Sequence, residues 1–257
     1  YGHVLLCPRV SEMLPQQIFA DALIPPLRMC AESKNPYFRV GYNSLGAYAT
    51  INHLHFQAYY LMEAFPIERA LSKPFAEDVF KNPKRPMGKQ VHAECLRVYD
   101  YPVRCIVFEL GSKGFVDLAK WIGRACTRLQ KRNIPFNMLM TDHGARVFVI
   151  PQIFSHKIAQ NKIPDWIVKT GINPAVFEIS GHMLFKREDD YEICSEAMAS
   201  EILASASLDE DEFCNLMREV LERTEEGEED EDRKNDIVRV VDSFVESSNF
   251  DINNFLK

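Results

Sequence analysis

The stretch "TINHLHFQAYYL" at residues 50–61 decides the fold, because polar and apolar side chains alternate along it. Such alternation is typical of a β-strand with one buried face. His53, His55 and Gln57 then share one face, and the opposite face is apolar. A single histidine in this setting is usually a half-buried residue bonded to the backbone. Three successive polar groups would each need a buried partner, so we infer that this face carries the chemistry.

Alternating histidines serve two kinds of chemistry. Neutral imidazoles bind metal ions, and an imidazole can also act as a nucleophile toward phosphorus. The loop before the strand favours the second use, because its small residues supply N–H groups and short polar side chains suited to phosphate. No acidic residue or cysteine lies within residues 50–57, so we assign no metal. The residues assigned to phosphate binding in the loop are Asn43, Ser44, Gly46 and Ala47.

The composition narrows the class of protein. A chain of 257 residues, 46% of them hydrophobic, can bury the core of one large domain or two small ones. The net charge of -7 gives no general attraction to nucleic acid, which we exclude as a partner. No apolar stretch approaches the roughly 18 residues that span a bilayer, so no membrane partner is expected either.

The cysteines indicate a reducing compartment. There are seven, an odd number, and none forms a C-x-x-C pair. This pattern argues against a disulfide framework and against a zinc ribbon. We therefore predict a cytoplasmic protein, with the nucleus as a second location.

The order of elements predicts an α+β fold built from two similar halves. Each half reads as strand, helix, strand, loop and strand, and is expected to form an antiparallel sheet with flanking helices. The first half spans 1–92 and begins without methionine, so we expect the natural protein to start further upstream. The second half spans 93–190. A helical extension follows over 191–257, with an acidic linker at 224–236.

Apolar spacing also locates the individual elements. A proline-rich connection is expected at 73–91, and the pair Pro25-Pro26 should break any helix that contains it. Strands are predicted at 4–7, 37–42, 50–61, 103–110, 136–141 and 146–152. Helices are predicted at 12–33, 114–133, 186–208, 210–222 and 237–247.

Several of these stretches resemble known proteins. "NSLGAYATINHLHFQ" resembles the signature of the histidine-triad superfamily. "HLHFQ", with Gln57 at the place of a third histidine, resembles the branch of galactose-1-phosphate uridylyltransferase. "NPYFRVGYNSLGAYATINHLHFQAYYL", "IPFNMLMTD" and "NPAVFEISGHMLFKR" are similar to the plant GDP-L-galactose phosphorylases.

The resemblance implies guanylyl transfer through a covalent intermediate. His55, the second histidine of the motif, would be the nucleophile, and Gln57 would donate to a phosphate oxygen while His53 orders the strand and loop. The implied substrates are a GDP-hexose, GDP-L-galactose in particular, and inorganic phosphate. The products would be L-galactose 1-phosphate and GDP, within ascorbate synthesis. No redox cofactor is implied, and relatives form homodimers.

Other readings stay open beside this one. The enzyme could act on GDP-D-glucose, or it could be a hydrolase in which water replaces phosphate. A non-catalytic nucleotide-binding protein is the third reading, although such a protein has no need of the nucleophile His55.

Further candidate residues lie outside the motif. Arg9 and Arg39 are the cations considered for phosphate contact. His182, His143 and Asp142 are candidates for contact with the sugar or the acceptor phosphate, although an ordinary turn and a strand end explain them equally well.

Overall fold

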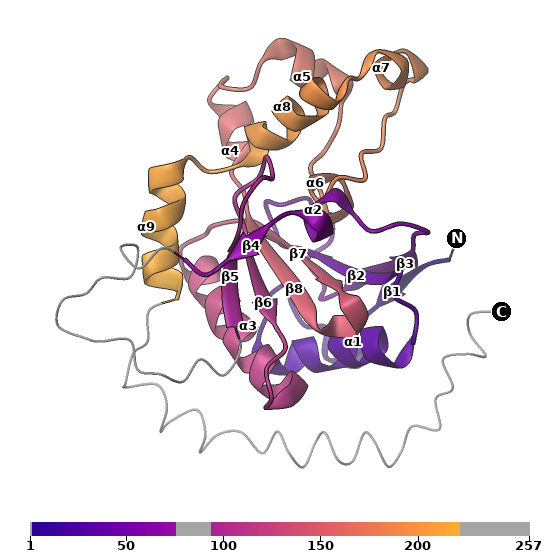
Figure 1. The fold of residues 1–257 in the computed structure, drawn as a ribbon, viewed down its shortest axis with the longest axis vertical. Coiled ribbons are helices and arrows are strands. Elements are labelled where there is room, and N and C mark those ends of the chain that lie inside the picture. Colours follow the sequence, from indigo (N-terminus) through magenta and orange to yellow (C-terminus); the bar gives the residue numbers. More distant parts are fainter. Residues whose placement is uncertain (1, 76–93, 222–257) are drawn as a thin grey trace.

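A computed structural model describes residues 2–75 and 94–221. The fold is α+β, as the sequence predicts, and an antiparallel sheet of eight strands forms its centre (Figure 1). The strands lie in the order β1-β3-β2-β7-β8-β6-β5-β4. They are β1 (His3–Leu6), β2 (Phe38–Asn43), β3 (Phe56–Tyr60), β4 (Ser72–Lys73), β5 (Glu94–Val98), β6 (Ile106–Glu109), β7 (Phe136–Thr141) and β8 (Arg146–Pro151).

Strands from both halves of the sequence join in this sheet. β2 and β7 lie side by side at the junction, with Val40 opposite Met140 and Asn43 opposite Asn137. Outward from this pair the order is β2-β3-β1 on one side and β7-β8-β6 on the other, so three strands of each half lie in the same order, and β5 and β4 follow β6 at the edge. The expectation of one sheet in each half is corrected, since pairing β2 with β7 satisfies backbone groups that two free edges would expose.

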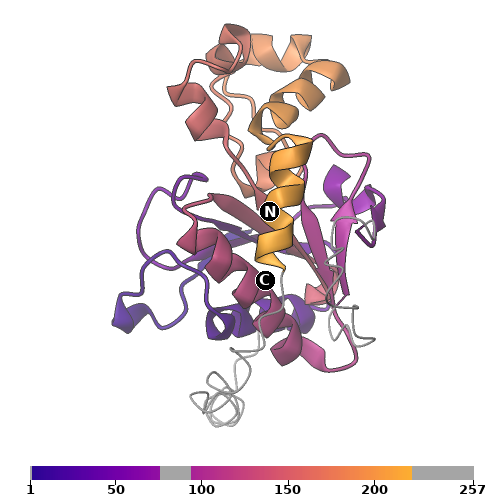
Figure 2. The same cartoon turned by 90° about the vertical axis from the view of Figure 1, so that its left-hand side faces the viewer.

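Helices α1 (Ala20–Glu32) and α3 (Gly114–Lys131) pack against each other and cover one face of the sheet. α9 (Glu210–Val220), the yellow-orange helix of Figure 2, packs against α3. The apolar side chains between these helices and the sheet form one large buried core.

α1 continues through Pro25 and Pro26, so the predicted break at this pair is wrong. Two prolines remove two helical N–H donors, which weakens an isolated helix. The apolar face of α1, including the fully buried Leu23 and Leu27, packs into the core. Tertiary packing of this kind supplies most helix stability in proteins and compensates for the missing bonds.

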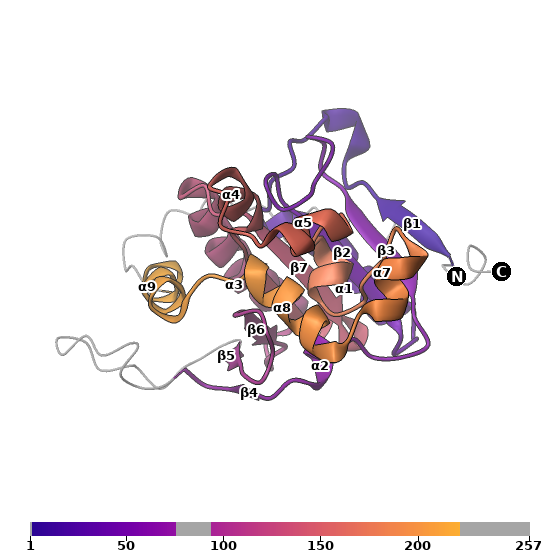
Figure 3. The ribbon, with the colours of Figure 1, turned by 90° about the horizontal axis from the view of Figure 1, so that it is seen from above.

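Short helices lie over the other face of the sheet, around a second apolar core. Figure 3 shows α5 and α8 above the strands. These helices are α2 (Pro66–Arg69), α4 (Phe154–Ala159), α5 (Asp165–Thr170), α6 (Val176–Ile179), α7 (Glu188–Ile193) and α8 (Glu196–Ala206). The helix predicted over 186–208 is therefore two helices, and the Ser195 hydroxyl caps the second by accepting from the Met198 N–H.

The strand predicted over 50–61 is shorter in the structure, because β3 begins at Phe56. The predicted alternation nevertheless starts earlier. Leu54, Phe56 and Ala58 are fully buried, whereas the residues between them are partly exposed. The predictions for most of the proline-rich connection, the acidic linker at 224–236 and the helix at 237–247 fall outside the described residues.

No helix in the described part of the chain is long and apolar enough to cross a membrane.

Candidate active site

His55 lies directly before β3, and its partly exposed ring is held by the backbone. Its Nδ1 is 2.8 Å from the carbonyl oxygen of His53. Because a carbonyl oxygen only accepts hydrogen bonds, Nδ1 must carry the ring proton. The Nε2 of the neutral ring then keeps its lone pair, so this geometry presents Nε2 as a nucleophile.

Gln16 is a buried residue that fixes the backbone of His55, and no feature of the sequence points to it. Its Oε1 accepts from the His55 N–H at 2.9 Å. Its Nε2 donates to the carbonyl oxygens of Asn43 at 2.8 Å and of His55 at 3.2 Å. The side-chain amide of Gln16 thus joins the end of β2 to the segment before β3. It takes the place of further backbone pairing between these two strands. Gln16 lies in an irregular segment, 39 residues before His55. A contact of this kind leaves no periodic pattern in the sequence.

Gln16→Ala is expected to destabilise the protein by about 2 kcal/mol or more, because three hydrogen bonds are lost and buried backbone groups stay unpaired. Urea unfolding measures this change. Gln17→Ala is the matched control, since Gln17 is the exposed neighbour. Equal stability of the two variants would contradict the role assigned to Gln16.

Gln57 lies in β3 between Leu5 of β1 and Gly41 of β2. Its side chain is partly exposed, on the face opposite the buried Phe56. A Cβ on Gly41 would come within 2.6 Å of Val176 Cγ1, so glycine lets α6 approach β2 beside Gln57. The amide of Gln57 can donate to an anionic oxygen without adding charge.

The loop after β2 is shaped by its own hydrogen bonds. The Ser44 N–H donates to the Phe136 carbonyl at 3.0 Å, and the Ala47 N–H donates to the Ser44 carbonyl at 3.0 Å. The Ser44 hydroxyl accepts from the Phe136 N–H at 2.8 Å. Gly46 has a φ of +81°, and its carbonyl accepts from the Ser155 hydroxyl at 3.2 Å. The N–H groups of Ser44 and Ala47, which the sequence assigned to phosphate, are therefore engaged inside the protein.

Asn43 belongs to a buried group of amides behind this loop. Its Oδ1 accepts from Asn137 Nδ2 at 2.7 Å and from the Val176 N–H at 2.8 Å. Asn137 Nδ2 also donates to the Ala47 carbonyl at 2.9 Å, and its Oδ1 accepts from Gln152 Nε2. Asn43 thus links β2, β7 and α6 just behind the site.

The two arginines considered for phosphate both face acidic partners. Arg39 is 1% exposed, and Glu68 binds its guanidinium through two hydrogen bonds of 2.9 and 3.1 Å. Arg9 lies on the surface, 3.4 Å from Glu12. The structure brings neither as a free cation to His55.

The three polar candidates of the second half separate in space. His182 Nδ1 is 3.1 Å from the hydroxyl of Tyr59, which lies in β3 two residues after Gln57. Asp142 and His143 form a 3₁₀ turn after β7, packed against α1. This turn is at the opposite end of β7 from Asn137, so the structure brings only His182 to the face that holds Gln57.

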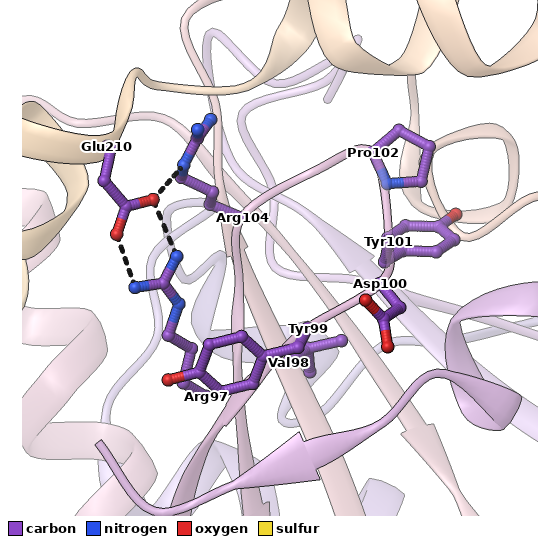
Figure 4. Close-up of a pocket in the computed structure, with 8 residues that line it drawn as sticks. All are labelled: Arg97, Val98, Tyr99, Asp100, Tyr101, Pro102, Arg104 and Glu210. Carbon is purple, nitrogen blue, oxygen red and sulfur yellow. Dashed lines mark hydrogen bonds and ion pairs between the residues drawn. The ribbon is translucent and has the colours of Figure 1, made fainter. Parts of the chain in front are cut away.

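A separate pocket of about 160 Å³ lies at the other edge of the sheet, between β5 and the start of α9 (Figure 4). Glu210 binds Arg97 at 2.6 and 2.7 Å and Arg104 at 2.8 Å. These bonds lower the pKa of the Glu210 carboxyl to about 2. Both guanidinium groups are held by this one carboxylate, and the ion pairs attach α9 to β5. We therefore assign this pocket a structural role.

Within residues 2–75 and 94–221, no group of three or more histidine, cysteine, aspartate or glutamate side chains is placed to hold a metal ion.

Comparison with known proteins identifies relatives of the chain. Its sequence matches the family models "GDPGP1-like, N-terminal domain" over residues 1–59 and "GDPGP1-like, C-terminal domain" over residues 76–227. GDP-L-galactose phosphorylase 1 of Arabidopsis thaliana is 44% identical over 243 residues, which cover 95% of this chain and 52% of that protein. GDP-L-galactose phosphorylase 2 of the same plant is 47% identical, over 83% of this chain and 47% of that protein.

More distant relatives and a solved structure also match. GDP-D-glucose phosphorylase 1 of Homo sapiens is 29% identical, over 81% of this chain and 52% of that protein. The chain thus spans about half the length of the curated relatives it matches. Yeast Ap4A phosphorylase Apa2, solved in complex with Ap4A, aligns with a TM-score of 0.53 at 18% identity, over 80% of this chain and 69% of that one. This likeness shows a shared fold.

Proposed function

Because the chain belongs to the GDPGP1-like family, we propose that it holds the guanylyl-transfer site of a GDP-L-galactose phosphorylase. Relatives of that name are 44% and 47% identical to it. The observation that carries the proposal is the bond from His55 Nδ1 to the His53 carbonyl, which leaves Nε2 free for attack on phosphorus. Gln57, two residues further along, supplies an amide donor for a phosphate oxygen.

The proposed reaction has two displacements. His55 Nε2 attacks the α-phosphorus of GDP-L-galactose, a P–N bond forms, and the bond to the bridging oxygen breaks to release L-galactose 1-phosphate. An oxygen of inorganic phosphate then attacks the guanylyl phosphorus, the P–N bond breaks, and GDP leaves. The His53 carbonyl stabilises the positive charge that the ring acquires in the first step. Two displacements divide one difficult step into two easier ones.

The test is the intact mass of the protein after brief mixing with GDP-L-galactose in phosphate-free buffer. We expect the mass of one guanylyl group to be gained, and to be lost on addition of phosphate as GDP appears. Release of GMP at a rate indifferent to phosphate would indicate the hydrolase instead. A protein that binds GDP but gains no mass and turns nothing over would be a non-catalytic binding protein.

A second candidate substrate is GDP-D-glucose, because relatives named GDP-D-glucose phosphorylase 1 are 28% and 29% identical to the chain. Their lower identity favours GDP-L-galactose. Equimolar competition between the two donors in the first displacement decides between them, and we expect GDP-L-galactose to form the adduct faster.

Further parts of the proposal concern organisation. We place the two repeated halves at 1–92 and 93–190 and the extension at 191–257. The matching orders β2-β3-β1 and β7-β8-β6 support two repeated halves, whereas β4 of the first half pairs with β5 of the second. We further propose a cytoplasmic homodimer, with the nucleus as a second location, that works without a bound metal.

A further inference from the structure

Tyr59 and His182 form a hydrogen-bonded pair beside the proposed site. The Tyr59 hydroxyl lies 3.1 Å from His182 Nδ1. Gln57 and Tyr59 follow His55 at two-residue steps, and each such step advances about 6.6 Å along a strand. The pair therefore lies one step beyond Gln57 on the same face of β3.

The surrounding aromatic rings fix both members of this pair. The ring of Tyr59 meets that of Phe177 edge-on, with 4.0 Å between centroids, and the ring of His182 lies 6.1 Å from that of Phe65. Phe65 and Phe177 are themselves buried. Gly181 adopts a φ of +107°, and a Cβ there would come within 2.5 Å of Pro66. The chain therefore reaches His182 by a turn that packs tightly on α2.

The hydrogen bond occupies one of the two nitrogens of the His182 ring. Burial and the nearby Glu178 carboxylate raise the pKa of the Tyr59 hydroxyl, so Tyr59 stays protonated. Burial lowers the pKa of the His182 ring, which favours its neutral form. The Tyr59 hydroxyl and the His182 ring share a hydrogen bond at Nδ1, which leaves Nε2 as the ring nitrogen for a ligand. Among the residues that the structure describes, none is hydrogen-bonded to this Nε2, and the His182 side chain is partly exposed.

Glu178 of α6 supplies an acceptor in the neighbourhood of Tyr59. Its negative charge acts on the Tyr59 hydroxyl, and its side chain is partly exposed. A carboxylate repels a phosphate group but accepts hydrogen bonds from hydroxyls. A neutral imidazole nitrogen together with a carboxylate acceptor therefore suits a sugar, whose hydroxyls both donate and accept. A guanine base would also need an accessible apolar slot, whereas the rings of Phe65 and Phe177 are buried.

We propose that His182, oriented by Tyr59, hydrogen-bonds through Nε2 to a hydroxyl of the hexose in the GDP-hexose substrate, with Glu178, near Tyr59, as an acceptor. His182 is then a residue that determines recognition of the sugar, and Tyr59 is a positioning residue. This inference rests on the proposed function, since it assigns one end of the same substrate.

Two assays separate the hexose from the rest of the substrate. The first is phosphorolysis of GDP-L-galactose. The second is exchange of radiolabelled phosphate into GDP, which passes through the same guanylyl-His55 but involves no hexose. We expect His182→Ala to lower kcat/KM for phosphorolysis about 10- to 100-fold while exchange changes less than about 3-fold. Tyr59→Phe should show the same split with a smaller loss. His156→Ala, at an exposed histidine of α4, should affect neither assay.

The other outcomes overturn the inference. Equal losses in both assays would mean that His182 contacts guanine, ribose or phosphate, or only supports the fold. No loss in either assay would mean that the His182 side chain does not contact the substrate. If His182→Ala does not fold, His182→Gln, which keeps an N–H donor, takes its place in both assays. The proposal is wrong unless the rate of phosphorolysis in His182→Gln falls by a larger factor than the rate of exchange. Failure of the proposed function looks different, because the wild-type protein would then show no exchange of phosphate into GDP.

Discussion

His55→Asn is expected to abolish the guanylyl adduct and to lower turnover on the order of 10⁴-fold or more, because the variant cannot form the P–N bond. Asparagine keeps part of the size and hydrogen bonding of histidine, so the donor should still bind. Intact-protein mass in phosphate-free buffer measures the adduct, and phosphate-dependent release of GDP measures turnover.

His53→Asn is the informative comparison for this variant. The bond to His55 Nδ1 uses the backbone carbonyl of His53, which any residue at this position retains. His53→Asn should therefore still form the adduct. A guanylyl group that persists in His55→Asn and maps to His53 would show that the other histidine is the nucleophile.

The turnover rate of Gln57→Ala should lie between the rates of His53→Asn and His55→Asn. It removes a donor to the phosphate oxygen but leaves the reacting atom in place, and the loss of one such donor typically lowers the rate by ~10² to 10³. The adduct should still form, more slowly. An unchanged rate would mean that the Gln57 amide does not contact the phosphate.

The segment from His53 to Ala58 was largely readable from the sequence, because its pattern is local. Alternation from His53 to Ala58 shows directly in the order of apolar and polar residues, and burial in the structure follows it. What the pattern could not give is where the strand begins. β3 starts at Phe56 because Gln16, far away in the chain, takes up the backbone groups of His55.

Long-range partners explain most of what was missed. Arg39 looks like a free cation in the sequence, but Glu68, which neutralises it, lies 29 residues away. Tyr59 reads as one more aromatic residue of a strand, and only the fold places it against His182, 123 residues further along. The same reasoning explains why Asp142 and His143 could not be separated from His182 beforehand.

The Arg39–Glu68 pair leads to the largest expected effect on stability. Arg39 is 1% exposed and Glu68 binds it through two hydrogen bonds, at the strand position directly opposite Tyr59. Glu68→Gln keeps an oxygen that can still accept from the Phe65 N–H, but it leaves the buried guanidinium without a counter-charge. Breaking a buried ion pair on one side typically costs about 3–5 kcal/mol, so urea unfolding should show a loss of this size.

Two further variants separate charge from packing in this prediction. Glu63→Gln removes the carboxylate of an exposed pair, 3.5 Å from Arg69, and should change stability by less than about 1 kcal/mol. Replacing both buried partners, as Arg39→Met with Glu68→Leu, should recover much of the stability lost in Glu68→Gln, because no isolated charge remains inside the protein. If the double variant is less stable than Glu68→Gln, the loss arises from packing and from the Phe65 hydrogen bond, and the buried charge is not its cause.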